Sequence, residues 1–305
     1  MSDPTRKRRN AGKSGDGGGQ KPYKSKGMKA RGGPKRSAGS RSHGAVSEPR
    51  KPNRKGGKPN YRKGGAQNWI WGWHAVQAVL ANPRRTVHKI LATDTAAMRL
   101  GLSEGHADLK VVPASYIDQS LPRGAAHQGV AVKAAPLEWP ALSDIADGAD
   151  EDALILVLDQ ITDPHNVGAM LRLASAFGAA AVVMQTRKAP PLAGATAKVA
   201  VGCLETVPVC LETNIAQTLQ QLQRFGYRIV GLAGETERAL GDALVKGSRN
   251  VIVMGAEGPG LRELVAKNCD VLARIPMQSQ PVPGQAESLN VATAAAIALY
   301  EARRG

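Results

Sequence analysis

Apolar residues in the second half of the chain form short continuous runs, and these runs alternate with segments of helical spacing. Residues 154–158 read Leu-Ile-Leu-Val-Leu, which is typical of a strand covered on both faces in a parallel sheet. Further strand candidates lie at residues 180–184, 206–211, 227–232, 251–254 and 271–275. The intervening segments have helical spacing of apolar residues. This alternation predicts an α/β fold with an open, mostly parallel sheet that helices cover on both faces.

A smaller group of elements precedes this region and begins near Trp69. Helix candidates lie at residues 74–80 and 94–105, and strand candidates lie at 87–92, 111–112 and 129–132. We interpret residues 68–138 as a small α/β domain. Residues 139–152 are rich in Asp and Ala and have little apolar periodicity, so we expect a linker there, followed by a second domain at residues 153–305.

Residues 1–67 differ from the rest of the chain because they contain no Ile, Leu, Phe or Trp. Such a segment cannot bury enough apolar surface to offset its chain entropy, so we expect it to be disordered. It holds 20 Lys and Arg against three acidic residues, a net charge of +17, whereas the whole chain carries +16. The tail alone is therefore polycationic, which suits either an RNA partner or a solubilising or targeting role.

Several classes of protein are disfavoured by the sequence. No apolar run approaches the roughly 20 residues that span a bilayer, and no signal-peptide pattern is present, so we expect a soluble protein without a membrane partner. Its cysteines are Cys203, Cys210 and Cys269, an odd number without CxxC spacing. We therefore expect no metal site and no disulfide framework, and a reducing cytoplasm fits the chain best.

Ligands of parallel α/β sheets bind at the carboxyl ends of the strands, so the loops after the strands are the places to look for chemistry. The first candidate loop follows residue 158 and enters a helix that carries Asn166 and Arg172. Asn166 either caps this helix or takes part in a site. Arg172 either belongs to the same site or occupies an ordinary solvent-exposed position.

The second loop holds Gly255, Gly258 and Gly260 after the strand at residues 251–254. These glycines either let backbone approach a ligand closely or make a tight turn. Their spacing is not GxGxxG, and the strand at 154–158 is followed directly by Asp-Gln-Ile-Thr-Asp-Pro without a glycine, which argues against a dinucleotide fold.

The third loop reads Ile275-Pro276-Met277 and continues through a polar, Pro-rich stretch to Ser288-Leu289-Asn290. A helix rich in Ala follows and runs to Arg303, with Ser288 as the expected N-cap. From the residues alone, the three loops make a plausible small-molecule site without naming the molecule.

Together the three loops resemble the motifs of the SpoU branch of the knotted SPOUT methyltransferases, over residues 69–303. The first loop matches Asn-x-Gly-x-x-x-Arg, and the second matches Gly-x-Glu-Gly-x-Gly. The third matches Ile-Pro-Met followed by Ser-Leu-Asn-Val. The matching positions are Asn166, Gly168, Arg172, Gly255, Glu257, Gly258, Gly260, residues 275–277 and residues 288–291.

The resemblance implies a fold and an activity. In this family the C-terminal part forms a deep trefoil knot, and the enzymes act as homodimers that transfer a methyl group from S-adenosylmethionine to a ribose 2′-hydroxyl of RNA. The segments Gly72-x-His74-Ala75-Val76 and His127-Gln128-Gly129-Val130 resemble the L30e-like RNA-binding domain of enzymes that methylate a guanosine of 23S ribosomal RNA.

The resemblance also implies roles for individual residues. Backbone and apolar contacts from Gly255, Ile275 and Leu289 would hold the adenosine, with Met277 and Gly260 beside them. The catalytic residues would be Arg172, Asn166, Glu257, Ser288 and Asn290. Arg172 would bind the ribose 2′-oxygen and the neighbouring phosphate, because a guanidinium matches the geometry of a phosphate. It is too basic to accept the proton itself.

Two features depart from the family pattern and several alternatives stay open. Thr293 occupies a position where the relatives often have Asn. The stretch Gln278–Glu287 is longer than in the relatives, so the rim of the cofactor site or the dimer contacts can differ. His74 and His127 either contact RNA or are structural, and the Trp69, Trp71 and Trp73 group either packs or stacks on bases. The alternative functions are a transfer-RNA ribose methyltransferase and a non-catalytic RNA-binding factor in ribosome assembly.

Overall fold

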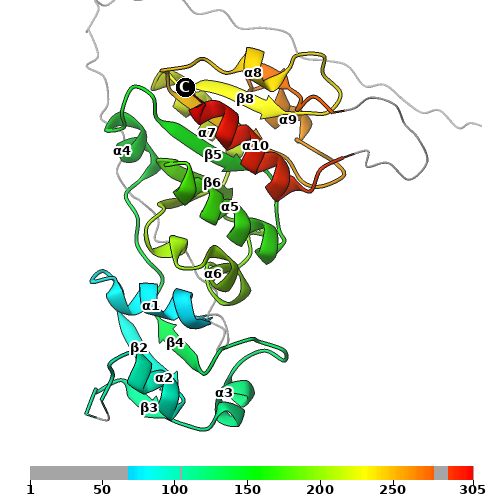
Figure 1. The fold of residues 1–305 in the computed structure, drawn as a ribbon. Coiled ribbons are helices and arrows are strands. Elements are labelled where there is room, and N and C mark those ends of the chain that lie inside the picture. The colour runs from blue at the N-terminus through cyan, green and yellow to red at the C-terminus, as the bar shows by residue number, and fades with distance from the viewer. Residues whose placement is uncertain (1–67, 104, 278–287, 305) are drawn as a thin grey trace, which may run out of the picture. The chain divides into compact units, whose positions relative to one another are not determined.

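The computed structural model describes residues 68–103, 105–277 and 288–304 (Figure 1). The predicted disordered tail at residues 1–67 and the long stretch at 278–287 lie outside the described residues. Among the described helices, none has both the length and the apolar character needed to cross a membrane. The same residues contain no group of three or more His, Cys, Asp or Glu side chains that could hold a metal ion.

The first sheet has the strand order β1-β4-β2-β3. Its strands are β1 (Trp69–Trp71), β2 (Val87–Ala92), β3 (Leu109–Val111) and β4 (Val130–Ala134), and its helices are α1 (Trp73–Ala81), α2 (Asp94–Arg99) and α3 (Ala114–Ser120). β4 pairs antiparallel with both β1 and β2, and β2 pairs parallel with β3. The three-residue strand β1 and the helix α3 were not expected, because such short segments show no clear periodicity.

The second sheet is entirely parallel and has the order β10-β8-β9-β5-β6-β7. Its strands are β5 (Leu154–Leu158), β6 (Ala181–Gln185), β7 (Val209–Glu212), β8 (Arg228–Leu232), β9 (Asn250–Met254) and β10 (Val271–Ala273). Each overlaps a run of apolar residues that predicted a strand, so the predicted α/β fold with a mostly parallel sheet is confirmed.

Helices cover both faces of the parallel sheet. They are α4 (Leu142–Asp147), α5 (Pro164–Ala176), α6 (Gly194–Ala200), α7 (Ile215–Arg224), α8 (Leu240–Ala243), α9 (Glu263–Ala266) and α10 (Val291–Arg303), with a 3-10 turn η1 at Cys203–Glu205. The interval 139–152, where we expected little regular structure, contains α4, because Leu142 and Ala146 are buried against the sheet.

Alternate side chains of the strands feed two apolar layers. In β5, Leu154, Leu156 and Leu158 join the layer of α5, α6, α8 and α10, whereas Ile155 and Val157 join that of α4, α7 and α9. α5 contacts both α6 and α10 on its own face of the sheet (Figure 1). The layers account for the uninterrupted apolar runs, because both faces of each strand are buried.

Candidate active site

The order of the parallel strands decides which loops can meet. β9 lies between β5 and β8, and β10 lies beside β8. The loop after β9 is therefore adjacent to the loop after β5, and the loop after β10 lies one strand beyond β8. The carboxyl ends share one edge of the sheet, which is where ligands of such folds bind.

The first loop begins at Asp159 and leads into α5. Asp163, not Asn166, is the N-cap of α5, because its side chain accepts a hydrogen bond from the His165 backbone N–H at 3.1 Å. Pro164 occupies the first turn, where its missing N–H costs nothing. The capping alternative for Asn166 is therefore wrong, and its side chain is free for other contacts.

A hydrogen bond joins the first and third loops. Asn290 Nδ2 donates to Asn166 Oδ1 at 3.2 Å, across 124 positions of sequence. Asn290 is also the N-cap of α10, since its Oδ1 accepts from the backbone N–H groups of Ala292 at 2.9 Å and Thr293 at 3.4 Å. The expectation that Ser288 caps this helix is wrong: Ser288 is exposed and the cap lies two residues later.

Arg172 is exposed on α5 and makes no hydrogen bond or ion pair with another described residue. Six positions separate it from Asn166, which in a helix corresponds to about 9 Å along the axis and about 120° around it. Within one chain, therefore, the structure does not bring these two side chains together.

The second loop closes on itself after β9. Ala256 and Gly260 exchange backbone hydrogen bonds, with N···O distances of 3.1 and 2.9 Å. A Cβ atom at Gly255 would lie 2.2 Å from the carbonyl carbon of Gly260, so only glycine fits there. Gly258 and Gly260 have φ values of +84° and +69°, which favour glycine. Glu257 is exposed in this loop.

The third loop leaves β10 with backbone groups that have no hydrogen-bond partner in the part of the chain that the structure describes. The backbone of Arg274 is paired on both sides: its N–H donates to the Arg238 carbonyl, and its carbonyl accepts from the Leu240 N–H. Ile275 and Met277 make no hydrogen bond to another described residue, and the same is true of Leu289. Ile275 and Leu289 are half-buried, and 45% of Met277 is exposed. These segments offer apolar side chains and free backbone groups to a ligand.

Asp159 is a residue of this edge to which sequence reasoning gave no role. It is fully buried, and its Oδ1 accepts from the Arg262 guanidinium at 2.6 and 2.8 Å and from Gln185 Nε2 at 3.0 Å. Its Oδ2 accepts from the Arg262 backbone N–H at 3.0 Å. The available signal was a lone carboxylate directly after a wholly apolar strand.

The loop after β8 was also missed. Residues 233–236 lie between the second and third loops in the order of the sheet, and a Cβ atom at Gly234 would meet nothing within 4 Å. The available hint was Gly234, two residues after a buried strand.

The motif residues of the first sheet have structural partners. His127 is buried, with Nε2 at 3.2 Å from Asp118 Oδ1, and its Nδ1 accepts from the Gly129 N–H at 3.1 Å. Trp69 and Trp71 are buried, which favours the packing interpretation of the tryptophan group. His74 is exposed.

Burial makes two of the three cysteines poor nucleophiles. Burial, reinforced by the negative charge of Glu212, raises the pKa of the Cys210 thiol to about 12. Burial, together with the carboxylates of Asp270 and Asp159, raises the pKa of Cys269 to about 12 as well. Cys203, Cys210 and Cys269 are all free thiols. A neutral thiol is a poor nucleophile, so Cys210 and Cys269 are structural.

Comparison with known families matches both parts of the chain. The SpoU rRNA Methylase family covers residues 153–300, and a family described as RNA 2′-O ribose methyltransferase substrate binding covers residues 69–140. Among curated relatives, the 23S rRNA (guanosine-2′-O-)-methyltransferase RlmB of Vibrio cholerae is 40% identical over 248 residues, covering 77% of this chain and 96% of the relative. The RlmB of Ralstonia nicotianae is 41% identical over 243 residues, covering 76% and 94%.

Solved structures show the same fold. A putative RNA methyltransferase of the TrmH family from Porphyromonas gingivalis superimposes with a TM-score of 0.62 at 27% identity, over 77% of this chain and 89% of the other. An AdoMet-bound rRNA methyltransferase from Sinorhizobium meliloti gives a TM-score of 0.64 at 24% identity, over 77% and 86%. Because curated relatives are about 40% identical over nearly their whole length, and because the family model matches residues 153–300, the chain belongs to the SpoU rRNA methylase family.

Proposed function

We propose that this protein transfers a methyl group from S-adenosylmethionine to a ribose 2′-hydroxyl of RNA, and that its substrate is a guanosine of 23S ribosomal RNA. The observation that carries the proposal is the Asn290–Asn166 hydrogen bond at 3.2 Å, which joins two of the family motifs at the edge where the glycine loop also ends. The relatives named as 23S rRNA guanosine methyltransferases support the choice of substrate.

The residues at this edge fit the cofactor. Adenosine is largely flat and apolar, with polar atoms along its edges that pair with backbone groups. Ile275, Met277 and Leu289 supply apolar contacts and backbone groups that no other described residue pairs with. In the loop from Gly255 to Gly260, the glycines leave the backbone uncovered by side chains at the same edge of the sheet. When bound, the cofactor supplies a methyl group on a positively charged sulfur.

The catalytic roles follow from the position and chemistry of the side chains. Asn290 fixes the orientation of the Asn166 amide, so Asn166 is preorganised to contact the RNA backbone. Arg172, which has no hydrogen-bond or ion-pair partner among the described residues, binds the phosphate next to the reacting ribose and stabilises the developing charge. A phosphate oxygen or water takes the proton. Exposed Glu257 and Ser288 orient the substrate at the rim.

The proposal includes a homodimer. Arg172 faces away from Asn166 of its own chain. In a dimer, the second copy would bring its own Asn166 and motif loops close to Arg172. Two large apolar side chains of α10, Ile297 and Tyr300, are 38% and 55% exposed, as expected of a surface that a partner covers. Light scattering should give the mass of a dimer, and a monomer at micromolar concentration would contradict this part.

The domain organisation completes the proposal. Residues 68–138 form an L30e-like RNA-binding domain, residues 139–152 link it to the methyltransferase domain at 153–305, and the latter contains a trefoil knot. Support for the knot comes from the path of the chain, which leaves β10 at one edge of the sheet and returns to pack α10 against α5. We also propose a cytoplasmic location, which a ribosomal RNA substrate supports.

Mapping of 2′-O-methyl groups tests the substrate directly. Total RNA from cells with and without the gene should differ at a guanosine of 23S ribosomal RNA. Loss of a mark from transfer RNA would instead show the transfer-RNA alternative. No lost mark anywhere, with RNA binding by the purified protein intact, would show a non-catalytic binding factor.

Replacement of Arg172 tests the mechanism. We expect Arg172→Ala to lower the turnover of 23S rRNA methylation by about 100-fold or more, the usual cost of removing a group that stabilises transition-state charge. Binding of S-adenosylmethionine, measured by calorimetry, should be unchanged. Arg224→Ala removes another exposed arginine, on α7, and is the matched control. Near-normal turnover of Arg172→Ala would exclude Arg172 from the mechanism.

Replacement of Gly255 tests the cofactor site. The added methyl group of Gly255→Ala would collide with the backbone of Gly260, so the closed loop must open. We expect loss of measurable S-adenosylmethionine binding by calorimetry. Gly105→Ala is the control, because a Cβ atom there meets nothing within 4 Å. Unchanged affinity of Gly255→Ala for S-adenosylmethionine would show that the cofactor does not bind at this loop.

A further inference from the structure

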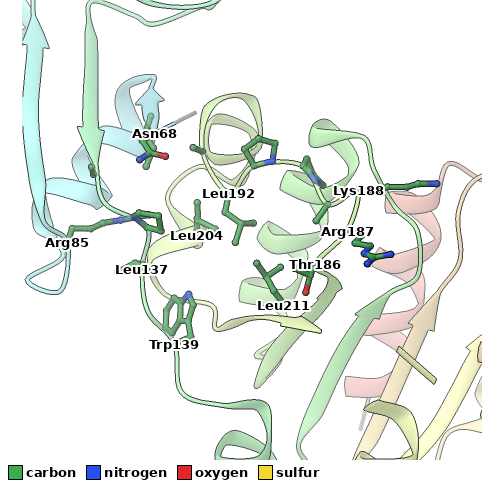
Figure 2. A pocket seen from close by; sticks show the side chains of 17 residues that line it. Asn68, Arg85, Leu137, Trp139, Thr186, Arg187, Lys188, Leu192, Leu204 and Leu211 are labelled. Atoms are coloured by element: carbon green, nitrogen blue, oxygen red, sulfur yellow. The ribbon is translucent and has the colours of Figure 1, made fainter. Parts of the chain in front are cut away.

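A cavity of about 880 Å³ lies where the two sheets meet, apart from the glycine loop (Figure 2). One side is formed by Asn68 and Ile70 at β1, by Arg85 before β2, and by residues between the end of β4 and Trp139. The other side is formed by the segment after β6 and by Leu192, Leu204 and Leu211, which Figure 2 shows as an apolar wall. Its volume falls within the range of ordinary ligand pockets, about 300 to 1,000 Å³.

The charged residues that line this cavity are all basic. The residues that line it include Arg85, Arg187 and Lys188 and no Asp or Glu. Arg85 is neutralised, because its guanidinium pairs with buried Glu205 at 2.8 Å. Arg187 and Lys188 are exposed and make no hydrogen bond or ion pair with another described residue. The cavity therefore has an apolar wall and two cations available to an anionic ligand.

The two cations also lie beside the proposed active site. They follow β6, the neighbour of β5 in the sheet. Arg187 and Lys188 also line a second, smaller depression, together with Gln160 and Thr162 of the first motif loop. In Figure 2 their side chains extend away from the leucine wall. They therefore mark a path from the cavity to the loop that leads into α5.

We propose that the cavity holds one unpaired nucleotide of the RNA substrate, close in sequence to the nucleotide that is methylated. The base lies against the leucine wall and the Trp139 indole, and its phosphate binds Arg187 and Lys188. This inference rests on the proposed function. Proteins recognise RNA most specifically through splayed-out bases that contact aromatic or apolar side chains, while cations bind the backbone.

Another occupant is conceivable from the sequence, namely the tail at residues 1–67, which joins the cavity wall at Asn68. Its net charge of +17 disfavours it, because the cavity lining is itself cationic. An RNA phosphate, in contrast, complements Arg187 and Lys188. Charge therefore selects the nucleic acid over the chain's own tail.

Charge reversal tests the role of the two cations. We expect the double variant Arg187→Glu, Lys188→Glu to weaken binding of a 23S rRNA transcript at least tenfold, raise KM for that RNA similarly, and leave S-adenosylmethionine affinity unchanged. The control is Arg224→Glu, Lys267→Glu, which makes the same change in net charge at exposed positions of α7 and after α9. Equal RNA affinity in the variant and the wild type, or an equal loss in the control, would overturn the inference.

The readout of RNA affinity separates this inference from the proposed function. If the wild type binds the transcript but does not methylate it, the proposed function fails, while loss of binding in the variant still supports the cavity. If the wild type methylates normally and the variant does too, the cavity assignment fails alone.

Crosslinking identifies the occupant. Thr186 lines the cavity and is exposed, so a photoreactive p-benzoylphenylalanine in its place should be tolerated. Irradiation of the full chain with the transcript should attach RNA at this position, and sequencing of the adduct should place the attached nucleotide near the methylated guanosine. Capture of a peptide from residues 1–67 or of a second copy of the chain, or no capture of RNA, would overturn the inference.

Discussion

At the scale of single residues, Asp159 connects the elements of the proposed active site. Its carboxylate binds Arg262 after the second motif loop and Gln185 at the end of β6, while its own N–H donates to the Met254 carbonyl. A buried carboxylate is tolerated only when its charge is matched by donors, and all of these donors come from the carboxyl edge of the sheet. The residue thus sets the positions of three loops rather than reacting itself.

Removal of this charge should weaken the fold measurably. We expect Asp159→Asn to lower the free energy of unfolding by about 2 kcal/mol, because hydrogen bonds to a buried charge are lost. The loss is limited because the Arg262 side chain is 44% exposed and can be solvated. Urea unfolding measures the change, with Asp147→Asn at an exposed position of α4 as control. Equal stability of both variants would contradict the assignment.

At the scale of elements, the glycine of the first motif has a packing role. A Cβ atom at Gly168 would lie 2.7 Å from the Thr196 carbonyl oxygen and 2.7 Å from Val199 Cβ. Gly168 therefore lets α5 and α6 approach closely. Both helices contact structure beyond the parallel sheet: α5 packs on α10, and α6 contacts α1 and β1. The Asn-x-Gly spacing thus combines a site residue with a packing residue.

The sign of a Gly168→Ala effect distinguishes packing from helix propensity. Alanine normally stabilises a helix interior by about 1 kcal/mol relative to glycine. Here we expect the opposite, a loss of about 1 to 3 kcal/mol, because overpacking forces the helices apart. Gly241→Ala in α8 is the control, since its added methyl group would meet only the flexible end of Glu301. If urea unfolding showed that Gly168→Ala stabilises the protein, the close approach of α5 and α6 at Gly168 would be contradicted.

At the scale of the whole molecule, one buried ion pair links the first sheet to the second. Arg85, just before β2, donates to Glu205 of η1 at 2.8 to 3.2 Å and also to the Ala135 carbonyl. Asn82 donates to the same carboxylate at 2.8 Å. The side chains of Arg85 and Glu205 are only 3% and 5% exposed. This contact holds the family-matched substrate-binding region against the methyltransferase region.

Breaking this pair should affect both stability and RNA recognition. We expect Glu205→Gln to lower the free energy of unfolding by about 3 kcal/mol or more, because Arg85 is left as an unpaired buried charge. The control is Glu263→Gln, which breaks an exposed ion pair with Lys267 and should change the free energy of unfolding by less than about 1 kcal/mol. KM for RNA should rise in Glu205→Gln while S-adenosylmethionine affinity is kept. An unchanged KM would show that the contact does not position the RNA.

The sequence alone was sufficient for much of the fold because buried parallel strands leave a local pattern. The apolar run at 154–158 and its successors predicted the sheet, and the motif at Asn166 to Arg172 predicted the family. The short elements were missed or misjudged: β1 and α3 have too few residues for periodicity, and α4 falls in a stretch rich in Asp and Ala. The caps were misplaced by two or three residues, since several Ser, Asp and Asn candidates precede each helix.

Only the tertiary structure decided which distant residues meet. The chain order of the strands does not give the sheet order, which inserts β8 between the second and third motif loops. Arg262 binds Asp159 from 103 positions away, and Asn290 binds Asn166 from 124. The backbone hydrogen bonds that pair strands are nearly the same for every residue type, so the sequence does not show which strands are neighbours. The strand order, and with it these two side-chain pairs, follows from how helices pack on both faces of the sheet. The residue types of each loop could be identified in the sequence, whereas the residues that each loop contacts became known only from the fold.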